Sequence, residues 1–142
     1  MISVSEATAI ISAHTRDFGI EKIALQQDAG HVLREPLLAD RDFPPFSRVA
    51  MDGIAISYHS YREGQRQFAI EGILAAGAPP ATLDNPKGCF EVMTGAVLPS
   101  GADTVVRYED VNIENGAAVI RADSVREGQD VQTQGMERRQ EE

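Results

Sequence analysis

The chain has 142 residues, with 13 basic and 22 acidic side chains and a formal net charge of −9. This length fits one domain with a short appendage, since domains usually run to about 100–150 residues. The acidic balance argues against nucleic acid as a partner, and neither a membrane span nor a signal peptide is predicted. A single cysteine, Cys89, excludes an intramolecular disulfide, so we expect a cytoplasmic protein.

The N-terminal segment predicts an amphipathic helix from Ser3 to Phe18. Apolar side chains recur at helical spacing, and Ser3 with Glu6 forms a capping-box pattern. Gly19 is typical of the residue that follows a helix. We expect the apolar stripe to be buried against the rest of this chain, a second copy, or a further domain.

The next segment predicts short elements and then a loop. A brief strand is predicted from Lys22 to Leu25, and a single helical turn from Asp28 to Leu33, which Asp28 could cap. Two adjacent prolines, Pro44 and Pro45, predict an irregular loop from Asp40 to Met51, because proline interrupts helices and removes ladder donors. Surface loops of this kind commonly carry binding residues.

The remainder predicts strands separated by glycine and proline clusters. The predicted strands are Gly53–Ser57, Gln67–Ala75, Cys89–Met93, Thr104–Tyr108 and Ala117–Arg121. Asn115-Gly116 predicts a hairpin between residues 111–113 and 118–120, because glycine accepts the positive φ of such a turn.

The polar segment from Glu127 to Glu142 is interpreted either as a severed connection or as an ordinary frayed tail. The expected fold class is therefore mostly β with α (α+β). We expect an N-terminal helix over residues 1–20, a β-rich, barrel-like domain with hairpins over 21–125, and a polar connection to further domains over 126–142.

A motif scan alone indicates no enzyme. The three histidines are isolated, and no ligand spacing, phosphate-cradling glycine loop or nucleophile elbow is present. Two short segments are still candidates for a functional site.

The first candidate is the proline-rich segment Phe43–Gly53. It places Arg48 and Asp52 on one rigid loop, where Arg48 could contact a phosphate and Asp52 a cation, a metal-bound water or a proton. The alternative is that Asp52-Gly53 serves only as a turn.

The second candidate is Met93–Pro99, where a strand ends in Thr94-Gly95. Glycine lets a ligand approach the backbone, and the Thr94 hydroxyl can donate to an anionic oxygen. The alternative is a simple strand-to-loop transition.

These motifs, taken together, resemble the N-terminal part of the molybdopterin molybdenumtransferases, the MoeA family, whose eukaryotic relatives include the gephyrin E domain. The segments that carry the resemblance, in order, are Phe43–Gly53, Gly72–Pro80, Met93–Ala96, Leu98–Val106, Glu109 and Glu127–Val131. This chain departs from the family pattern at Ser47, where an aspartate is usual, at Gln132, where an arginine is usual, and at Glu137, where an aspartate is usual.

The resemblance implies insertion of molybdate into adenylylated molybdopterin, with release of the adenylate and with magnesium as the cofactor. It implies a cleft with this domain as one wall and a later domain of the partner subunit of a homodimer as the other. Asp52 and Thr94 carry over as catalytic residues, and the substrate-binding candidates are Ser47, Arg48, Met51, Gly53 and Gly95. The metal ligands are left open.

Family members are longer than this chain, so we expect an N-terminal fragment that is inactive alone. Two alternatives stay open. The chain could be a non-catalytic module that binds molybdopterin or a protein partner, or the two motifs could be turns in an unrelated β domain.

Overall fold

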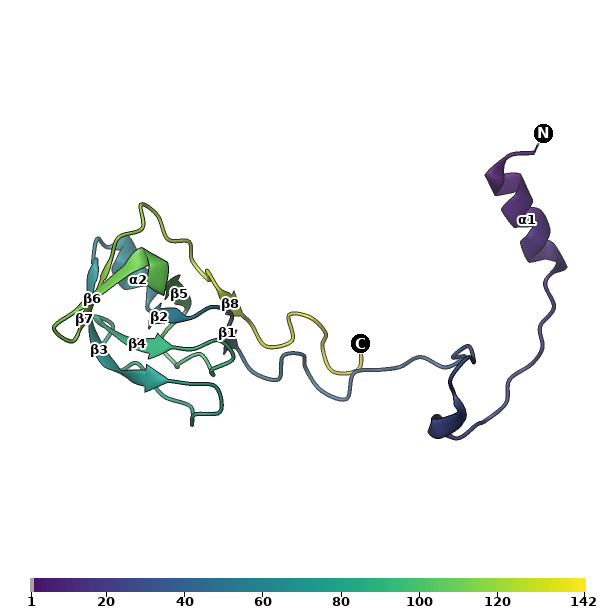
Figure 1. Ribbon diagram of the computed structural model, residues 1–142, viewed down its shortest axis with the longest axis horizontal. Coiled ribbons are helices and arrows are strands. Elements are labelled where there is room, and N and C mark those ends of the chain that lie inside the picture. Colours follow the sequence, from purple (N-terminus) through teal and green to yellow (C-terminus); the bar gives the residue numbers. More distant parts are fainter. Residues whose placement is uncertain (1) are drawn as a thin grey trace. The chain divides into compact units, whose positions relative to one another are not determined.

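The computed structural model describes residues 2–142 and divides into two compact units, one ending at Leu37 and one spanning Leu38–Glu142 (Figure 1). The first unit contains helix α1, Val4–His14, and a short 3-10 helix, η1, Leu25–Gln27. None of the helices in residues 2–142 has the length and apolarity that crossing a bilayer requires.

Helix α1 begins as predicted and ends early. The capping box is present, because the Glu6 N–H donates to the Ser3 hydroxyl and the Ser3 N–H donates to the Glu6 carboxylate. The helix ends at His14 rather than Phe18, because the Thr15 hydroxyl donates a hydrogen bond to the Ser12 carbonyl and the Thr15 backbone is extended. Gly19 instead closes a turn by donating to the Asp17 carboxylate at 2.9 Å, with φ at +81°.

Two predictions in this unit are wrong. The segment predicted as a strand from Lys22 to Leu25 forms no ladder in the part of the chain that is described, and η1 begins at its end. The helical turn predicted from Asp28 to Leu33 is a tight turn, in which the His31 N–H donates to the Asp28 carbonyl. Gly30 has φ at +86°, which a right-handed helix cannot accommodate, and Asp28 ends η1 instead of capping a helix.

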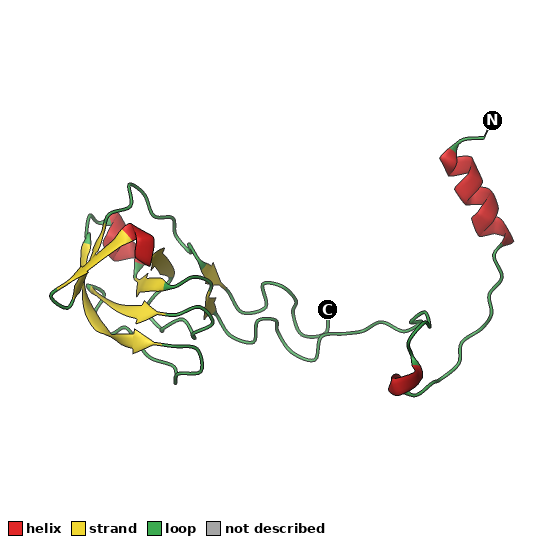
Figure 2. Cartoon of the chain, viewed as in Figure 1, coloured by secondary structure: helices red, strands yellow, loops and turns green. Residues whose placement is uncertain are grey.

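The second unit is built on a six-stranded sheet that curls into a half-barrel (Figure 2). The expected class, mostly β with α, is confirmed. The strands are β2 (Gly53–Ile56), β3 (Gln67–Leu74), β4 (Gly88–Val92), β5 (Thr104–Arg107), β6 (Val111–Glu114) and β7 (Ala117–Ile120). Their order is β5-β2-β4-β3-β7-β6, and only the β3–β4 pair is parallel.

The five predicted strands and the hairpin are confirmed, although their ends shift by a few residues. The hairpin between β6 and β7 turns at Asn115-Gly116, and both residues have positive φ, as the turn requires. The sequence did not predict helix α2, Tyr58–Arg62, or the 3-10 helix η2, Tyr108–Asp110.

The prediction of an irregular loop and the frayed-tail interpretation both need correction. Within the loop, β1 (Arg48–Val49) pairs antiparallel with β8 (Val131–Gln132). Further along, the Phe43 N–H donates to the Arg138 carbonyl at 2.8 Å. The proline-rich segment and the polar C-terminal segment therefore satisfy each other's backbone groups.

The sheet is buried on both faces at β2, the strand next to the edge strand β5. All four β2 residues are buried, and the side chains of Ile54, Ala55 and Ile56 alternate between two clusters, as the twofold period of a strand requires. One cluster consists of Ile54, Ile56, Tyr61, Phe68, Cys89, Val106, Ala118, Ile120 and Val125. The other consists of Val49, Ala55, Leu83, Val92, Ala96, Ala102 and Val105.

Candidate active site

Strand register brings the two predicted motifs together at one end of the sheet. Asp52 directly precedes β2, and Thr94 follows β4. Gly53 pairs with Val92 in the antiparallel β2–β4 ladder, so the residues beyond this pair leave the sheet side by side. The result is a direct contact between residues that are 42 positions apart in the sequence.

Thr94 holds one oxygen of the Asp52 carboxylate with two donors. Its backbone N–H lies 2.6 Å from Oδ1, and its hydroxyl lies 2.7 Å from the same oxygen. The second carboxylate oxygen, Oδ2, makes no hydrogen bond to any group in residues 2–142. Because Asp52 is exposed, this oxygen is available to a ligand.

The two donors also set the charge of Asp52. The backbone N–H of Thr94, followed by its hydroxyl, holds the pKa of Asp52 below its usual range. Hydrogen bonds to a carboxylate favour its ionised form. The Asp52–Thr94 pair therefore presents a fixed negative charge with one open oxygen.

Gly53 and Gly95 allow the backbone to take this shape. A Cβ at Gly53 would collide with the Val106 carbonyl of the neighbouring strand β5. Gly95 has φ at +85° and forms the turn after Thr94, where the Ala96 N–H donates to the Met93 carbonyl at 3.0 Å. Both glycines are thus required by backbone geometry.

Arg48 lies on the neighbouring β1–β8 ladder. Its Nε donates to Gln132 Oε1 at 2.6 Å, and its Nη2 lies 3.4 Å from Glu137 Oε1. An isolated bridge between Arg48 and Val97 ties β1 to the segment that follows Thr94. Within residues 2–142, the guanidinium makes no hydrogen bond to Asp52 or Thr94.

The other two predicted residues lie on the same loop. Ser47 is half-buried, and its hydroxyl accepts the backbone N–H of Gln134 at 3.2 Å. Its carbonyl accepts the Leu98 N–H at 3.0 Å. Met51 is 38% exposed, so its thioether can contact a ligand.

The match to known proteins covers the whole of this arrangement. The model of the MoeA N-terminal region, domains I and II, matches residues 2–142. The chain belongs to this family.

Two curated relatives, both named molybdopterin molybdenumtransferase, are cyanobacterial. The protein from Synechocystis is 45% identical over 120 residues, which cover 84% of this chain and 31% of the relative. The protein from Synechococcus elongatus is 31% identical over 147 residues, which cover 99% of this chain and 36% of the relative. The chain thus spans about a third of the length of these relatives.

Solved structures agree on the fold. A molybdopterin biosynthesis MoeA protein from Pyrococcus horikoshii aligns with a TM-score of 0.75 at 27% identity, over 86% of this chain and 33% of that one. A second MoeA structure from the same organism aligns with a TM-score of 0.72 at 24% identity, over 99% of this chain and 37% of that one.

Sequence reasoning missed two side-chain pairs beside the Asp52–Thr94 pair in this MoeA-family chain. Arg107, opposite Gly53 in the β2–β5 ladder, forms a two-point ion pair with Asp130. Tyr108 donates its backbone N–H to the Asp52 carbonyl and its hydroxyl to Glu91 at 2.9 Å. Only the strand order could have revealed these pairs, and local sequence patterns do not give it.

Burial raises the pKa of Tyr108 to about 12, and the hydrogen bond to Glu91 adds to the shift. The hydroxyl therefore stays protonated and serves as a donor. Burial, followed by the charges of Glu91 and Glu71, raises the pKa of Cys89 to about 12. A buried thiol in this state is not a nucleophile.

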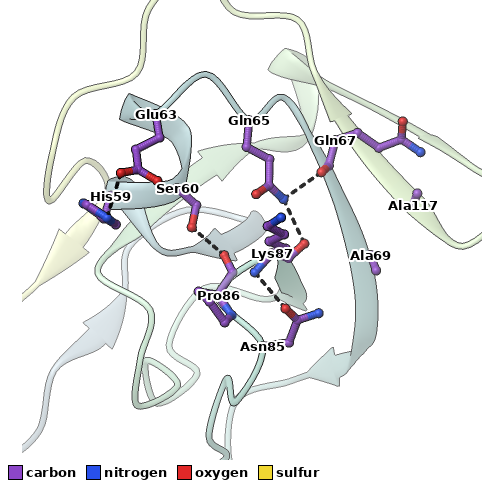
Figure 3. Close-up of a pocket in the computed structure, with 10 residues that line it drawn as sticks. All are labelled: His59, Ser60, Glu63, Gln65, Gln67, Ala69, Asn85, Pro86, Lys87 and Ala117. Carbon is purple, nitrogen blue, oxygen red and sulfur yellow. Dashed lines mark hydrogen bonds and ion pairs between the residues drawn. The ribbon is translucent and has the colours of Figure 1, made fainter.

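A groove of about 810 Å³ lies at the other end of β4, between α2, the start of β3 and residues 85–87 (Figure 3). None of the predicted site residues lines it. Its polar groups are largely paired with each other, as in the 3.2 Å contact between His59 and Glu63.

Proposed function

We propose that this chain forms one wall of the active site of a molybdopterin molybdenumtransferase. The reaction would insert molybdate into adenylylated molybdopterin and release the adenylate. Membership of the MoeA family and the names of the cyanobacterial relatives support this proposal. Because the chain spans about a third of those relatives, the proposal assigns the second wall to a later domain of the partner subunit in a cytoplasmic homodimer.

The observation that carries the proposal is the Asp52–Thr94 pair. Two donors fix Oδ1 and lower the pKa of the carboxyl, and they leave Oδ2 open. A preorganised charge of this kind needs no rearrangement when a ligand arrives. Asp52 would therefore orient the substrate or a metal-bound group through Oδ2.

A magnesium ion fits Asp52 as a single protein ligand. In residues 2–142, no three His, Cys, Asp or Glu side chains gather as a metal cage. Magnesium sites that act on phosphates commonly use one or two carboxylates, completed by waters and substrate phosphates. When bound, the ion would neutralise charge on the phosphates of the adenylylated substrate.

Thr94 has a different task from the one that the motif alone suggested. Its hydroxyl has one proton, and that proton is donated to Asp52. Thr94 therefore acts through Asp52 as a positioning residue, instead of donating to an anionic ligand. Gly95 shapes the turn that carries it, and Gly53 does the same for Asp52.

The remaining loop residues would bind substrate. Arg48 offers a planar cation that suits phosphate or molybdate oxygens, and Met51 offers an apolar contact. Ser47 is engaged through its hydroxyl and its carbonyl, so it would support the loop that presents Arg48.

The test is a reconstituted molybdenum insertion assay with the full-length protein. Asp52→Asn should lower the rate at least about 100-fold, the scale on which a preorganised electrostatic group acts. Asp17→Asn is the matched control, because Asp17 also accepts a backbone N–H, from Gly19 at 2.9 Å, and lies outside every segment that carries the family resemblance. A full insertion rate in Asp52→Asn would refute the proposed role.

The same assay separates the enzyme from the non-catalytic module. Saturable binding of adenylylated molybdopterin with no insertion by the full-length wild-type protein would favour a binding module. Insertion that Asp52→Asn abolishes would favour the transferase.

A further inference from the structure

The guanidinium of Arg48 is held by a hydrogen bond at Nε, whereas its Nη1 and Nη2 edge is largely open to a ligand. Arg48 and Gln132 are direct partners in the β1–β8 ladder, and the 2.6 Å bond from Nε to Gln132 Oε1 is partly buried. This bond fixes the plane of the guanidinium. Nη1 makes no hydrogen bond within residues 2–142, and Nη2 has only the 3.4 Å contact to Glu137.

The Glu137 contact is long and solvated. The Arg48 side chain is 39% exposed and the Glu137 side chain 56% exposed. Exposed ion pairs of this kind contribute little to stability. The Glu137 backbone, in contrast, is fixed, since its N–H donates to the Phe43 carbonyl at 2.9 Å. Only the side chain would have to move for the contact to open.

Arg107 shows what a permanent pair looks like in the same domain. Both of its bonds to Asp130 are 2.8 Å long, and the Asp130 side chain is only 12% exposed. A largely buried carboxylate therefore holds Arg107 through two short bonds and compensates its charge at close range. Arg48 differs because its short bond is to a neutral amide, so only the long contact to Glu137 compensates its positive charge.

We propose that Gln132 is the positioning residue for Arg48, and that Glu137 occupies the place of a tetrahedral oxyanion, which displaces it on binding. This inference rests on the proposed function, and it names the part of that site that recognises the anion. Two parallel N–H groups of one guanidinium match two oxygens of a tetrahedral anion. Glu137 is then a built-in competitor, and Gln132 keeps the guanidinium aimed while the competitor leaves.

Two anions share this chemistry, namely molybdate and the phosphate of the adenylate. Isothermal titration calorimetry of the full-length protein with sodium molybdate, and separately with AMP, distinguishes them. If Glu137→Gln tightens the binding of molybdate and not that of AMP, Arg48 binds the metal oxyanion. If it tightens the binding of AMP and not that of molybdate, Arg48 binds the adenylate phosphate.

The decisive variant is Glu137→Gln. Removing the competing carboxylate should tighten binding of one of these anions about two- to fivefold, the strength of an exposed ion pair. Glu141→Gln is the matched control, because it makes the same charge change on the same segment without a partner at Arg48. An equal gain in both variants would mean that the effect comes from net charge, and this would overturn the inference. The inference would also be overturned if the wild-type protein bound neither anion.

The positioning role has its own variant, Gln132→Ala. It should weaken anion binding at least about threefold. It should also abolish the gain from Glu137→Gln, because a guanidinium that Gln132 no longer orients does not bind the anion even when the competing carboxylate is removed. Gln134→Ala is the control on the same C-terminal segment. It removes an amide that donates to Asp42 instead of accepting from Arg48, so it should leave anion binding unchanged. Additive effects of the Gln132 and Glu137 substitutions would contradict the positioning role.

These titrations are independent of the proposed reaction. They do not involve Asp52, so an intact Glu137 effect together with full insertion by Asp52→Asn would refute the proposed function alone. A missing Glu137 effect together with loss of insertion in Asp52→Asn would refute the inference alone.

Discussion

Arg107 and Asp130 form a two-point ion pair across two segments of the second unit. Nε donates to Oδ2 and Nη2 donates to Oδ1, each at 2.8 Å. The pair joins the end of β5 to the residue that precedes β8, and the Asp130 carbonyl accepts the Ala50 N–H at 2.9 Å. It therefore helps to place the β1–β8 ladder that carries Arg48.

The pair makes stability depend on pH. The hydrogen bonds from Arg107 hold the pKa of Asp130 below its usual range, whereas in the unfolded chain it stays near 3.9. Because the folded pKa is the lower one, this stabilisation is present above about pH 4 and is lost as pH falls through the folded value. We expect Asp130→Asn to lower the melting temperature by a few degrees near neutral pH and to flatten its acid dependence.

Thermal melts followed by circular dichroism between about pH 7 and about pH 2.5 measure this effect. Asp123→Asn serves as the control, since Asp123 is exposed and has no ion pair among residues 2–142. If the Asp130→Asn variant loses as much stability on acidification as the wild type, the ion pair does not control the acid dependence.

A second prediction concerns the charge of Asp52. Thr94→Val keeps the backbone donor and removes the hydroxyl, the second of the two groups that lower the pKa of Asp52. The pKa should therefore rise towards its usual value and stay below it, because the backbone N–H persists. NMR titration of the Asp52 carboxyl carbon measures the shift directly.

The sign of the functional effect follows from this shift. A higher pKa means that the carboxylate is protonated at a higher pH, so binding of a divalent cation should fail earlier on acidification in Thr94→Val. Thr82→Val is the control, because Thr82 is exposed and makes no hydrogen bond to Asp52. An unchanged Asp52 titration in Thr94→Val would show that the hydroxyl does not set the charge.

Much of the second unit could be predicted from the sequence, because its strands are short, β-branched and bounded by turn residues. The hairpin at Asn115-Gly116 needs positive φ at both residues, and this requirement is visible in the sequence. The helix from Ser3 was predictable at its start for the same reason, since a capping box is a local pattern. Its end was not, because the Thr15 hydroxyl competes with the backbone.

The sequence could indicate which residues belong to the candidate site, but not how they are arranged in space. Asp52 and Thr94 stood out as motif residues, yet their contact depends on the pairing of Gly53 with Val92. Arg48 lies on the β1–β8 ladder with its partner Gln132, whereas the two adjacent prolines had predicted an irregular loop there. Strand pairing between distant segments is decided by tertiary packing, and a local pattern does not encode it.

The last prediction concerns the close approach of β2 to β5. A Cβ at Gly53 would meet the Val106 carbonyl oxygen, with the Val106 carbonyl carbon at 2.8 Å and the Arg107 Cα at 2.9 Å. All three are backbone atoms in the β2–β5 ladder, so they cannot move without breaking its hydrogen bonds. We expect Gly53→Ala to destabilise the protein by at least about 1–3 kcal/mol, as overpacking does.

Gly72→Ala is the matched control, because it adds the same methyl group to a strand of the same sheet. There the nearest atom is Phe90 Cε1 at 3.2 Å, in a side chain that can rotate away. Urea unfolding should therefore show a clearly larger loss for Gly53→Ala than for Gly72→Ala. Because Gly53 adjoins Asp52, Gly53→Ala should also disturb the Asp52 carboxyl signal in the NMR titration. Equal losses of stability in the two variants would mean that β2 and β5 can separate without cost.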